Sequence, residues 1–197
     1  MFQTKKKKEN KSFREEVIEY VRFTIIVLLI IIPIRIFIAQ PFVVSGQSMM
    51  PTFHDDDYII VDELSFKLEK PKRGQVIIFR LPSEHSRFLI KRIIGLPGET
   101  VTINGPKVTI TKKDGTVVQL NEDYIREKFS SYGTWKLQDE DYFVMGDNRN
   151  NSSDSRSWGI LNKKLIIGKT LLRLFPFKDI ALKPGEEKSA KIEVPLS

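Results

Sequence analysis

The sequence predicts a mostly antiparallel β domain behind one N-terminal transmembrane helix. Two observations support this fold class. A basic run followed by a long apolar stretch occupies residues 5–44, and the chain beyond it consists of short apolar segments separated by turn residues. With 197 residues, the chain is long enough for one anchored domain with a modest core.

The first predicted element is a membrane anchor at residues 21–40, preceded by a basic cytoplasmic segment at residues 1–20. Spanning a bilayer takes about 20 helical residues, and this stretch reaches that length if Arg35 snorkels at the outer interface. The run Lys5–Lys8 predicts a cytoplasmic N-terminus. A cleavable signal peptide shares the basic start and apolar middle, and is the alternative interpretation.

Composition narrows the function classes. A net charge of +7 raises nucleic-acid binding as a competing interpretation, but the basic run lies directly ahead of the apolar stretch, so we expect no nucleic-acid partner. The absence of cysteine excludes disulfides, thiol nucleophiles and cysteine-ligated metals. His54 and the three aspartates after it resemble a metal or triad cluster, but such acids more often form a solvated turn. We expect no metal ion and no cofactor.

Eight strands are predicted after the anchor. Each is a short apolar segment, and Asn104-Gly105 and Asp114-Gly115 are strong signals for two β-hairpins. Only residues 121–129 favour a helix, and the tail from residue 183 is predicted to be frayed. The predicted strands are residues 57–61, 75–79, 88–94, 100–103, 108–111, 116–120, 142–145 and 165–174.

Ser48 and Lys91 are the candidate chemical pair. A serine hydroxyl is a weak nucleophile that needs a base beside it, and a lysine serves as that base only where burial lowers its pKa. Lys91 lies in an apolar segment, where a strand would place Leu89, Lys91 and Ile93 on one face. A turn-forming serine and a solvated strand lysine are the ordinary alternatives.

Three sequence blocks extend this pattern. They are Ser48-Met49-Met50-Pro51-Thr52, Lys91-Arg92-Ile93-Ile94-Gly95-Leu96-Pro97-Gly98-Glu99 and Gly146-Asp147-Asn148-Arg149-Asn150-Asn151-Ser152-Ser153-Asp154-Ser155-Arg156. In this order they resemble the bacterial type I signal peptidases, also called leader peptidases, over a region from the anchor to about Phe177. That family keeps its anchor, which favours the anchor over the cleavable peptide.

The resemblance implies a Ser-Lys dyad, in which Ser48 attacks the scissile carbonyl and Lys91 is the general base. The backbone N–H of Ser48 would be one oxyanion donor. The second donor stays open, because Gly46 stands where some members have a serine and Ser45 lies one residue too far away.

The resemblance also implies supporting and substrate-binding residues. Ser152 would hydrogen-bond the Lys91 amine and orient it, and an ion pair between two further side chains would brace the site. The implied supporting residues are Ser152, Asp154, Arg156 and Asp147, with Asp154 and Arg156 as the ion pair. Met49 and Ile90 would line a pocket for small residues of the substrate.

By the same resemblance, the protein would be a membrane-bound serine endopeptidase that removes N-terminal signal peptides from exported preproteins. Its partners would be these signal peptides, the lipid bilayer and the export machinery. It would cross the bacterial cell membrane once, with an extracytoplasmic catalytic domain. The implied parts of that domain are a catalytic β core at residues 41–103 and 141–182, an inserted smaller β region at 104–140 and a C-terminal tail at 183–197.

Two alternative functions remain. A self-cleaving repressor-type protease also uses a Ser-Lys pair, but the anchor and the lack of a helix-turn-helix region disfavour it. A non-enzymatic membrane-anchored β-domain that binds surface partners is disfavoured by the three ordered blocks.

Overall fold

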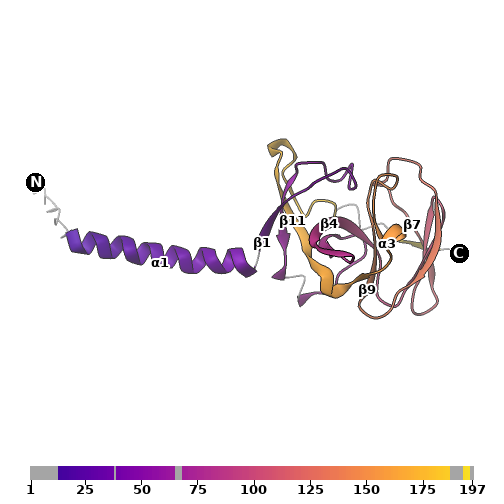
Figure 1. The fold of residues 1–197 in the computed structure, drawn as a ribbon, viewed down its shortest axis with the longest axis horizontal. Helices are drawn as coiled ribbons and strands as arrows, with labels where there is room; N and C mark the ends of the chain where they lie inside the picture. Colours follow the sequence, from indigo (N-terminus) through magenta and orange to yellow (C-terminus); the bar gives the residue numbers. More distant parts are fainter. Residues whose placement is uncertain (1–12, 38, 65–67, 187–192, 196–197) are drawn as a thin grey trace, which may run out of the picture. The chain divides into compact units, whose positions relative to one another are not determined.

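The structure, a computed structural model, describes residues 13–37, 39–64, 68–186 and 193–195. The chain divides into two compact units, residues 1–38 and residues 39–197 (Figure 1).

Helix α1 (Phe13–Phe37) is the described element of the first unit. Its first turn carries Glu15 and Glu16, and acidic side chains at this end interact favourably with the helix dipole. Residues 25–31 are apolar without interruption, and nearly two turns of such side chains make this part of the helix apolar on every side. The exposed apolar side chains in this stretch are Ile25, Ile26, Leu28, Leu29, Ile30 and Ile31.

Among the described residues, no helix is both long enough and apolar enough to cross a membrane. The predicted anchor, residues 21–40, falls partly outside them, because residue 38 and the side chains of residues 32–39 are not described. Its predicted end is two residues late, since Ala39 and Gln40 open the first strand of the second unit.

An eight-stranded antiparallel sheet forms the larger part of the second unit. Its strands are β1 (Ala39–Val43), β2 (Tyr58–Asp62), β3 (Val76–Leu81), β4 (Glu84–Gly95), β9 (Asp141–Met145), β10 (Leu161–Asn162), β11 (Ile166–Phe175) and β12 (Ala181–Leu182). The strand order is β1-β2-β11-β3-β4-β9-β10, and β12 pairs with β11. The short helical segments α3 (Ser155–Trp158), η1 (Lys163–Leu165) and η2 (Phe177–Asp179) accompany this sheet.

A five-stranded antiparallel sheet completes the second unit. Its strands are β5 (Thr100–Gly105), β6 (Lys107–Thr111), β7 (Val117–Leu120), β8 (Ser131–Lys136) and β13 (Glu193–Pro195), in the order β13-β7-β6-β5-β8. Both predicted hairpins are confirmed. Asn104 pairs with Lys107 at the first turn, and Asp114-Gly115 lies in the turn between β6 and β7.

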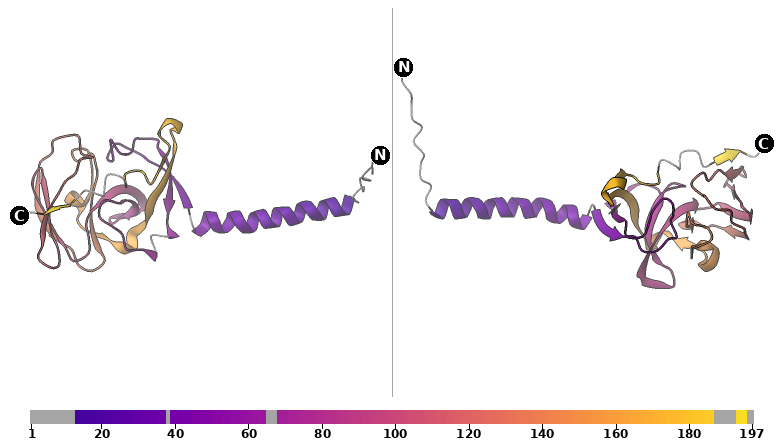
Figure 2. Two further views of the ribbon diagram at one scale, coloured as in Figure 1. Left: turned by 180° about the vertical axis from the view of Figure 1, so that it is seen from behind. Right: turned by 90° about the horizontal axis from the view of Figure 1, so that it is seen from above.

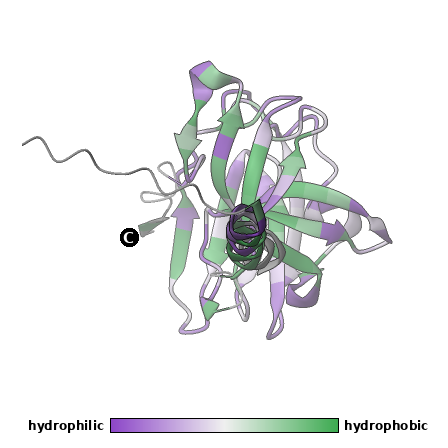
Figure 3. Cartoon of the chain, turned by 90° about the vertical axis from the view of Figure 1, so that its left-hand side faces the viewer, coloured by the Kyte–Doolittle hydropathy of each residue, from purple (hydrophilic) through white to green (hydrophobic). Residues whose placement is uncertain are grey.

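The two sheets occupy distinct parts of the second unit, as the labelled strands in Figure 1 and the two views in Figure 2 show. They nevertheless share buried side chains, because Ile94 and Phe143 of the first sheet pack in one cluster with Val101 and Ile110 of the second. Apolar residues are concentrated along the strands, whereas several loop tips are polar (Figure 3). This shared cluster therefore holds the two sheets of the second unit together.

Strand β4 is buried more completely than a half-buried strand. All of its residues from Ile90 to Ile94 are buried, so the side chains on both faces are covered. The expectation that one apolar face surrounds Lys91 was therefore too narrow. A strand in the interior of a sheet with side chains packed on both faces loses the alternation between buried and exposed positions.

Two predictions about the inserted region were wrong. The second sheet begins at Thr100, not at Asn104, because β5 pairs with β6 and β8. Residues 121–129 form no helix. Residues 187–192 and 196–197 of the tail that was predicted to be frayed lie outside the described residues. In its described parts, β13 pairs with β7 and the Gly185 carbonyl accepts a hydrogen bond from Arg92.

Strand β8 and helix α3 were not predicted at all. The sequence of β8 is largely polar and contains Gly133. A Cβ at this position would collide with the Trp135 ring, so only a glycine leaves room for that ring. Helix α3 begins inside the polar third block, where Asp154 caps it by accepting a hydrogen bond from the Arg156 N–H. Both depend on contacts that periodicity does not reveal.

Candidate active site

Ser48 lies in a turn between β1 and β2 that several hydrogen bonds hold in place. Gly46 has a φ of 89°, a left-handed conformation that favours glycine, and its N–H donates to Asp55 Oδ1 at 2.7 Å. The carbonyl of Ser48 accepts from the Asn148 N–H at 3.0 Å. The first and third sequence blocks therefore meet at the serine.

Lys91 lies on β4, and its Nζ is 2.6 Å from Ser48 Oγ. The amine also donates to the Ile90 carbonyl at 2.8 Å, and the side chain is only 2% exposed. The cross-strand neighbour of Lys91 on β3 is the fully buried Ile77, which adds an apolar side chain beside that of Lys91. This geometry places a lysine nitrogen where it can exchange a proton with the serine hydroxyl.

The pKa of Lys91 is lowered from its ordinary value of 10.5 to about 8. Burial is the main cause, because it disfavours the charged amine. The carboxylates of Asp154 and Asp147 act in the opposite direction, and Arg87 lowers the pKa further. A substantial neutral fraction therefore exists in the mildly alkaline range.

An apolar cavity of about 100 Å³ opens beside Ser48. It lies between β1 and β4, whose Phe42 and Phe88 rings are in edge contact at 5.4 Å between centroids. Its lining residues are Phe42, Val43, Val44, Ser45, Ser48, Ile59, Ile78, Phe88, Leu89, Ile90 and Lys91. Ile90 is among the residues that line this cavity. Met49 is not among them, although it is buried in one core cluster with Ile59 and Ile78, which do line the cavity.

Both strands that flank the cavity have a free edge. β1 pairs only with β2, and β4 pairs with β3 along one edge but meets β9 only from Arg92 onward, within the described residues. The edge of β4 from Phe88 to Lys91 therefore has unpaired backbone groups beside Ser48. An extended peptide could pair with such an edge.

Asp154 and Arg156 form the ion pair in the polar third block. The fully buried Asp154 carboxylate accepts from Arg156 Nε and Nη2, each at 2.8 Å, and from the Gly146 N–H at 3.0 Å. Burial raises the pKa of this carboxyl, but the hydrogen bond and charge of Arg156 outweigh burial and hold the pKa below its usual range. Asp154 thus joins the start of α3 to the end of β9.

Ser152 lies next to the serine segment. A Cβ added at Gly146 would collide with both Ser152 Oγ and the Ser48 carbonyl oxygen, so the three segments pack closely only around a glycine. The Ser152 hydroxyl is buried and makes no regular hydrogen bond within the described residues, although it helps to lower the pKa of Asp154. Lys91 contacts Ser48 and Ile90, and Ser152 is not among its described partners.

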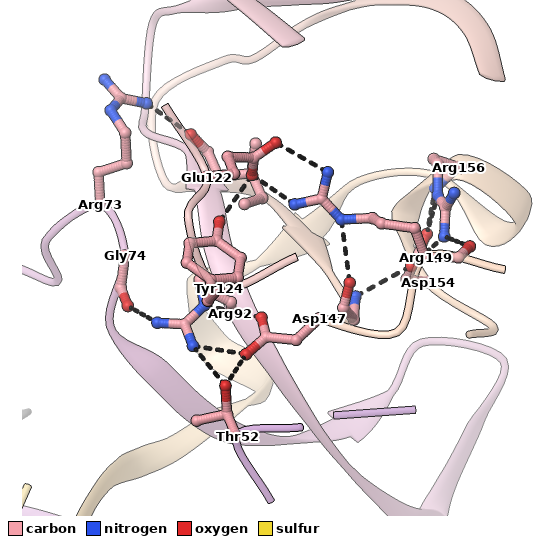
Figure 4. Close-up of polar contacts among 12 residues, drawn as sticks. Thr52, Arg73, Gly74, Arg92, Glu122, Tyr124, Asp147, Arg149, Asp154 and Arg156 are labelled. Atoms are coloured by element: carbon pink, nitrogen blue, oxygen red, sulfur yellow. Dashed lines mark hydrogen bonds and ion pairs between the residues drawn. The ribbon is translucent and has the colours of Figure 1, made fainter. Parts of the chain in front are cut away.

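Asp147 is held by Arg92, the residue after the candidate base (Figure 4). Arg92 Nε donates to Asp147 Oδ1 at 2.7 Å and Nη2 donates to Oδ2 at 2.5 Å, with both side chains fully buried. Thr52 of the first block donates to the same carboxylate at 2.5 Å. Burial alone would lower the pKa of Arg92, but the hydrogen bonds and charge of Asp147 raise it. The three sequence blocks are therefore joined at one carboxylate.

A further buried ion pair links the polar block to the loop between β7 and β8 (Figure 4). Arg149 pairs with Glu122, and its Nε donates to the Gly146 carbonyl at 3.0 Å. Tyr124 donates to the same glutamate at 2.6 Å, and its ring lies 4.1 Å from the Arg92 guanidinium. The five-stranded sheet thus supports the site through its loop.

The sequence did not single out Arg92, Glu122, Tyr124 or Arg149. Arg92 and Arg149 were visible inside the second and third blocks, and Arg92 lies in an apolar segment, where a buried arginine demands an acidic partner. Glu122 and Tyr124 gave no such signal, because their segment shows no recognisable periodicity.

A serine-lysine contact at a cavity, in an antiparallel β domain, is an arrangement that serine peptidases use, and these enzymes are hydrolases. A family model for signal peptidase, peptidase S26, matches residues 17–175. The chain belongs to this family.

Individual proteins similar to this chain are also named as signal peptidases. The chain is 37% identical over 183 residues to the signal peptidase I of Bacillus amyloliquefaciens, covering 89% of this chain and 97% of that protein. It is 32% identical to the probable signal peptidase I-2 of Synechocystis, covering 98% and 88%. A crystal structure of a signal peptidase I from Enterococcus faecalis is 31% identical, with a TM-score of 0.45, and covers 51% of this chain and 97% of that chain.

Proposed function

We propose that the protein is a membrane-bound serine endopeptidase that removes N-terminal signal peptides from exported preproteins with a Ser48–Lys91 dyad. One observation carries the proposal: the buried Lys91 amine lies 2.6 Å from the Ser48 hydroxyl, with a pKa lowered to about 8. Membership of the signal peptidase family supports the same chemistry.

The dyad acts by proton transfer. The neutral Lys91 amine takes the hydroxyl proton while Ser48 Oγ attacks the scissile carbonyl, and the backbone N–H of Ser48 stabilises the oxyanion. The ammonium then gives its proton to the leaving amine, which departs as the new N-terminus. Water attacks the remaining acyl-enzyme, with the amine again as base, and releases the signal peptide.

The supporting residues hold this geometry. Asp147 fixes the polar block to Arg92 and Thr52, and the Asp154–Arg156 pair braces the segment that packs on the serine carbonyl. Ser152 presents a buried hydroxyl without a regular partner in the described structure, and it orients the Lys91 amine during turnover. None of these side chains carries out a chemical step.

The cavity beside Ser48 takes the substrate residues that precede the scissile bond. A volume of about 100 Å³ with an apolar lining fits small side chains such as alanine. Ile90 contributes to that lining. The backbone of the substrate pairs as an extended strand with the free edges of β1 and β4.

Helix α1 anchors the enzyme in the bacterial cell membrane. The uninterrupted apolar stretch at residues 25–31 and the basic N-terminal run support a single crossing with a cytoplasmic N-terminus and an extracytoplasmic catalytic domain. In this position the enzyme meets the lipid bilayer, the export machinery and preproteins that are still embedded in the membrane.

Cleavage of a labelled preprotein by the purified full-length protein in detergent tests the proposal. The expected result is one cut at the signal-peptide junction, identified by mass spectrometry, with a rate that falls by at least about 10⁴-fold in Ser48→Ala. Ser45→Ala should lower the rate only modestly. Cleavage of the protein itself with an intact preprotein would favour the repressor-type protease, and an uncut preprotein would favour a binding domain.

A further inference from the structure

A second cavity lies at the residues that follow Ser48 in the chain. It has a volume of about 130 Å³ and shares no lining residue with the first. Its lining residues are Met50, Pro51, Arg126, Glu127, Asp147 and Asn148. Within the segment that contains Ser48, residues 42–45 and Ser48 line the first cavity, whereas Met50 and Pro51 line the second.

The second cavity is directly connected to the serine segment. The Asn148 N–H donates to the Ser48 carbonyl at 3.0 Å, and its Nδ2 donates to the Gln47 carbonyl at 3.2 Å. Met50 is two residues beyond Ser48, so their Cα atoms are at most about 7 Å apart. A peptide that extends past the serine covers this distance with two or three residues.

The direction of the peptide decides which part of it reaches this cavity. Under the proposed function, on which this inference rests, residues before the scissile bond occupy the first cavity. The residues after the bond, which become the N-terminus of the mature protein, must then leave on the other side of Ser48 Oγ. The second or third of these residues lies within reach of the second cavity.

The charged side chains at the second cavity give it a preference for an acidic ligand. Asp147 is already neutralised by Arg92, and Glu127 accepts a hydrogen bond from Asn150 Nδ2 at 3.4 Å. The exposed Arg126 guanidinium has no hydrogen bond or ion pair within the part of the chain that the structure describes. Arg126 is therefore the charged side chain at this cavity without a described partner, and a carboxylate is its natural partner.

We propose that the cavity at Met50, Pro51 and Arg126 is a binding site for the leaving side of the substrate, in which Arg126 selects an acidic side chain at the second or third residue of the mature protein. The contact adds specificity and takes no part in bond making. Because Arg126 is exposed, the discrimination is modest and decreases with salt.

Competition between matched substrates tests this site in the full-length enzyme in detergent. Two preproteins differ only in a glutamate or a lysine at the second residue after the cleavage site, and a second pair differs at the third residue. In at least one pair, kcat/KM for the glutamate substrate should exceed that for the lysine substrate about threefold at low salt. Arg126→Glu should invert this ratio, and Arg126→Gln should bring it close to one.

Lys107→Glu is the matched control, because it makes the same charge change at an exposed position on β6 and should leave the ratio unchanged. Equal cleavage of both members of each pair by the wild type, or an unchanged ratio in both Arg126 variants, would overturn the inference while leaving the proposed function intact. Failure to cleave any of the substrates would overturn the proposed function itself, and this inference with it.

Discussion

Lys91 Nζ and Ser48 Oγ lie 2.6 Å apart, although 43 residues separate them in the chain. Two features of the fold produce this contact. The serine turn is fastened to the polar block by the Asn148 N–H, and the lysine sits on a strand that is buried on both faces. The burial that lowers the pKa of the amine and the short distance to the hydroxyl therefore have the same structural origin.

The dependence of cleavage on pH should follow the Lys91 amine. Only the neutral amine accepts a proton, so kcat/KM should rise about tenfold per pH unit at low pH and level off above about 8. The measurement is kcat/KM for a fixed preprotein between pH 6 and 10. A profile that is flat across pH 6–8 would contradict a lysine base with this pKa.

Replacing Lys91 by methionine should stabilise the folded protein at neutral pH. The pKa of the amine is about 8 when folded and near 10.5 when unfolded, so the unfolded state binds more protons between these values. Below pH 8 the amine is charged, and its burial lowers the free energy of unfolding of the wild type by about 3 kcal/mol. The methionine variant avoids this cost but loses the hydrogen bonds of the amine, which are worth about 1 kcal/mol. Lys91→Met should thus gain about 2 kcal/mol at pH 7.

This advantage should shrink as the pH rises through the window from 8 to 10.5, because the wild type regains its stability there. Chemical denaturation of both proteins at pH 7 and pH 10 gives the difference in the free energy of unfolding. Equal differences at the two pH values would show that Lys91 has an ordinary pKa in the folded state.

The loop between β7 and β8 should contribute strongly to stability through its buried ion pair. Glu122→Ala leaves Arg149 charged and unpaired in the interior, where its side chain is only 1% exposed, and should cost about 3–5 kcal/mol. Asp139→Ala breaks the exposed pair with Lys113 and should cost at most about 1 kcal/mol. Similar losses in the two variants, measured by urea denaturation, would contradict the structural role of this pair.

A comparison of the first hairpin with the Glu122–Arg149 ion pair shows which features the sequence predicts and which it does not. The hairpin at Asn104-Gly105 was predictable, because the preference of that dipeptide for a tight turn is local. The Glu122–Arg149 contact was not, because it joins a segment without periodicity to a polar loop. The pairing depends on how the two sheets come together, which no short window of sequence contains.

Within the site, the residue types of the first two blocks led to Ser48 and Lys91, but not to the environment of Lys91. Alternation along a strand assumes one covered face, and the face that was predicted held only Leu89, Lys91 and Ile93. In the structure both faces of β4 are covered, so Arg92 is as deeply buried as its neighbours and holds Asp147. Met49 is next to Ser48 in the sequence, but this proximity does not place it at the cavity.

The anchor should be separable from catalysis. A chain that begins at Ala39 keeps all of β1 and should cleave a preprotein in detergent, because the whole site lies in the second unit. A chain that begins at Phe42 removes most of β1 and should be less stable. Fractionation of cells should show that the chain from Ala39 is lost from the membrane fraction, whereas full retention would contradict anchoring by α1.

The most direct test of the dyad is the rate of preprotein cleavage by Lys91→Arg. Arginine keeps the positive charge and the length of the side chain, but it stays protonated and cannot act as a base. If Lys91 is the general base, Lys91→Arg should be as inactive as Lys91→Ala over pH 6–10, with the folded state confirmed by circular dichroism. Cleavage by Lys91→Arg at a rate near that of the wild type would show that Lys91 acts only as a charge, and would contradict the Ser48–Lys91 mechanism.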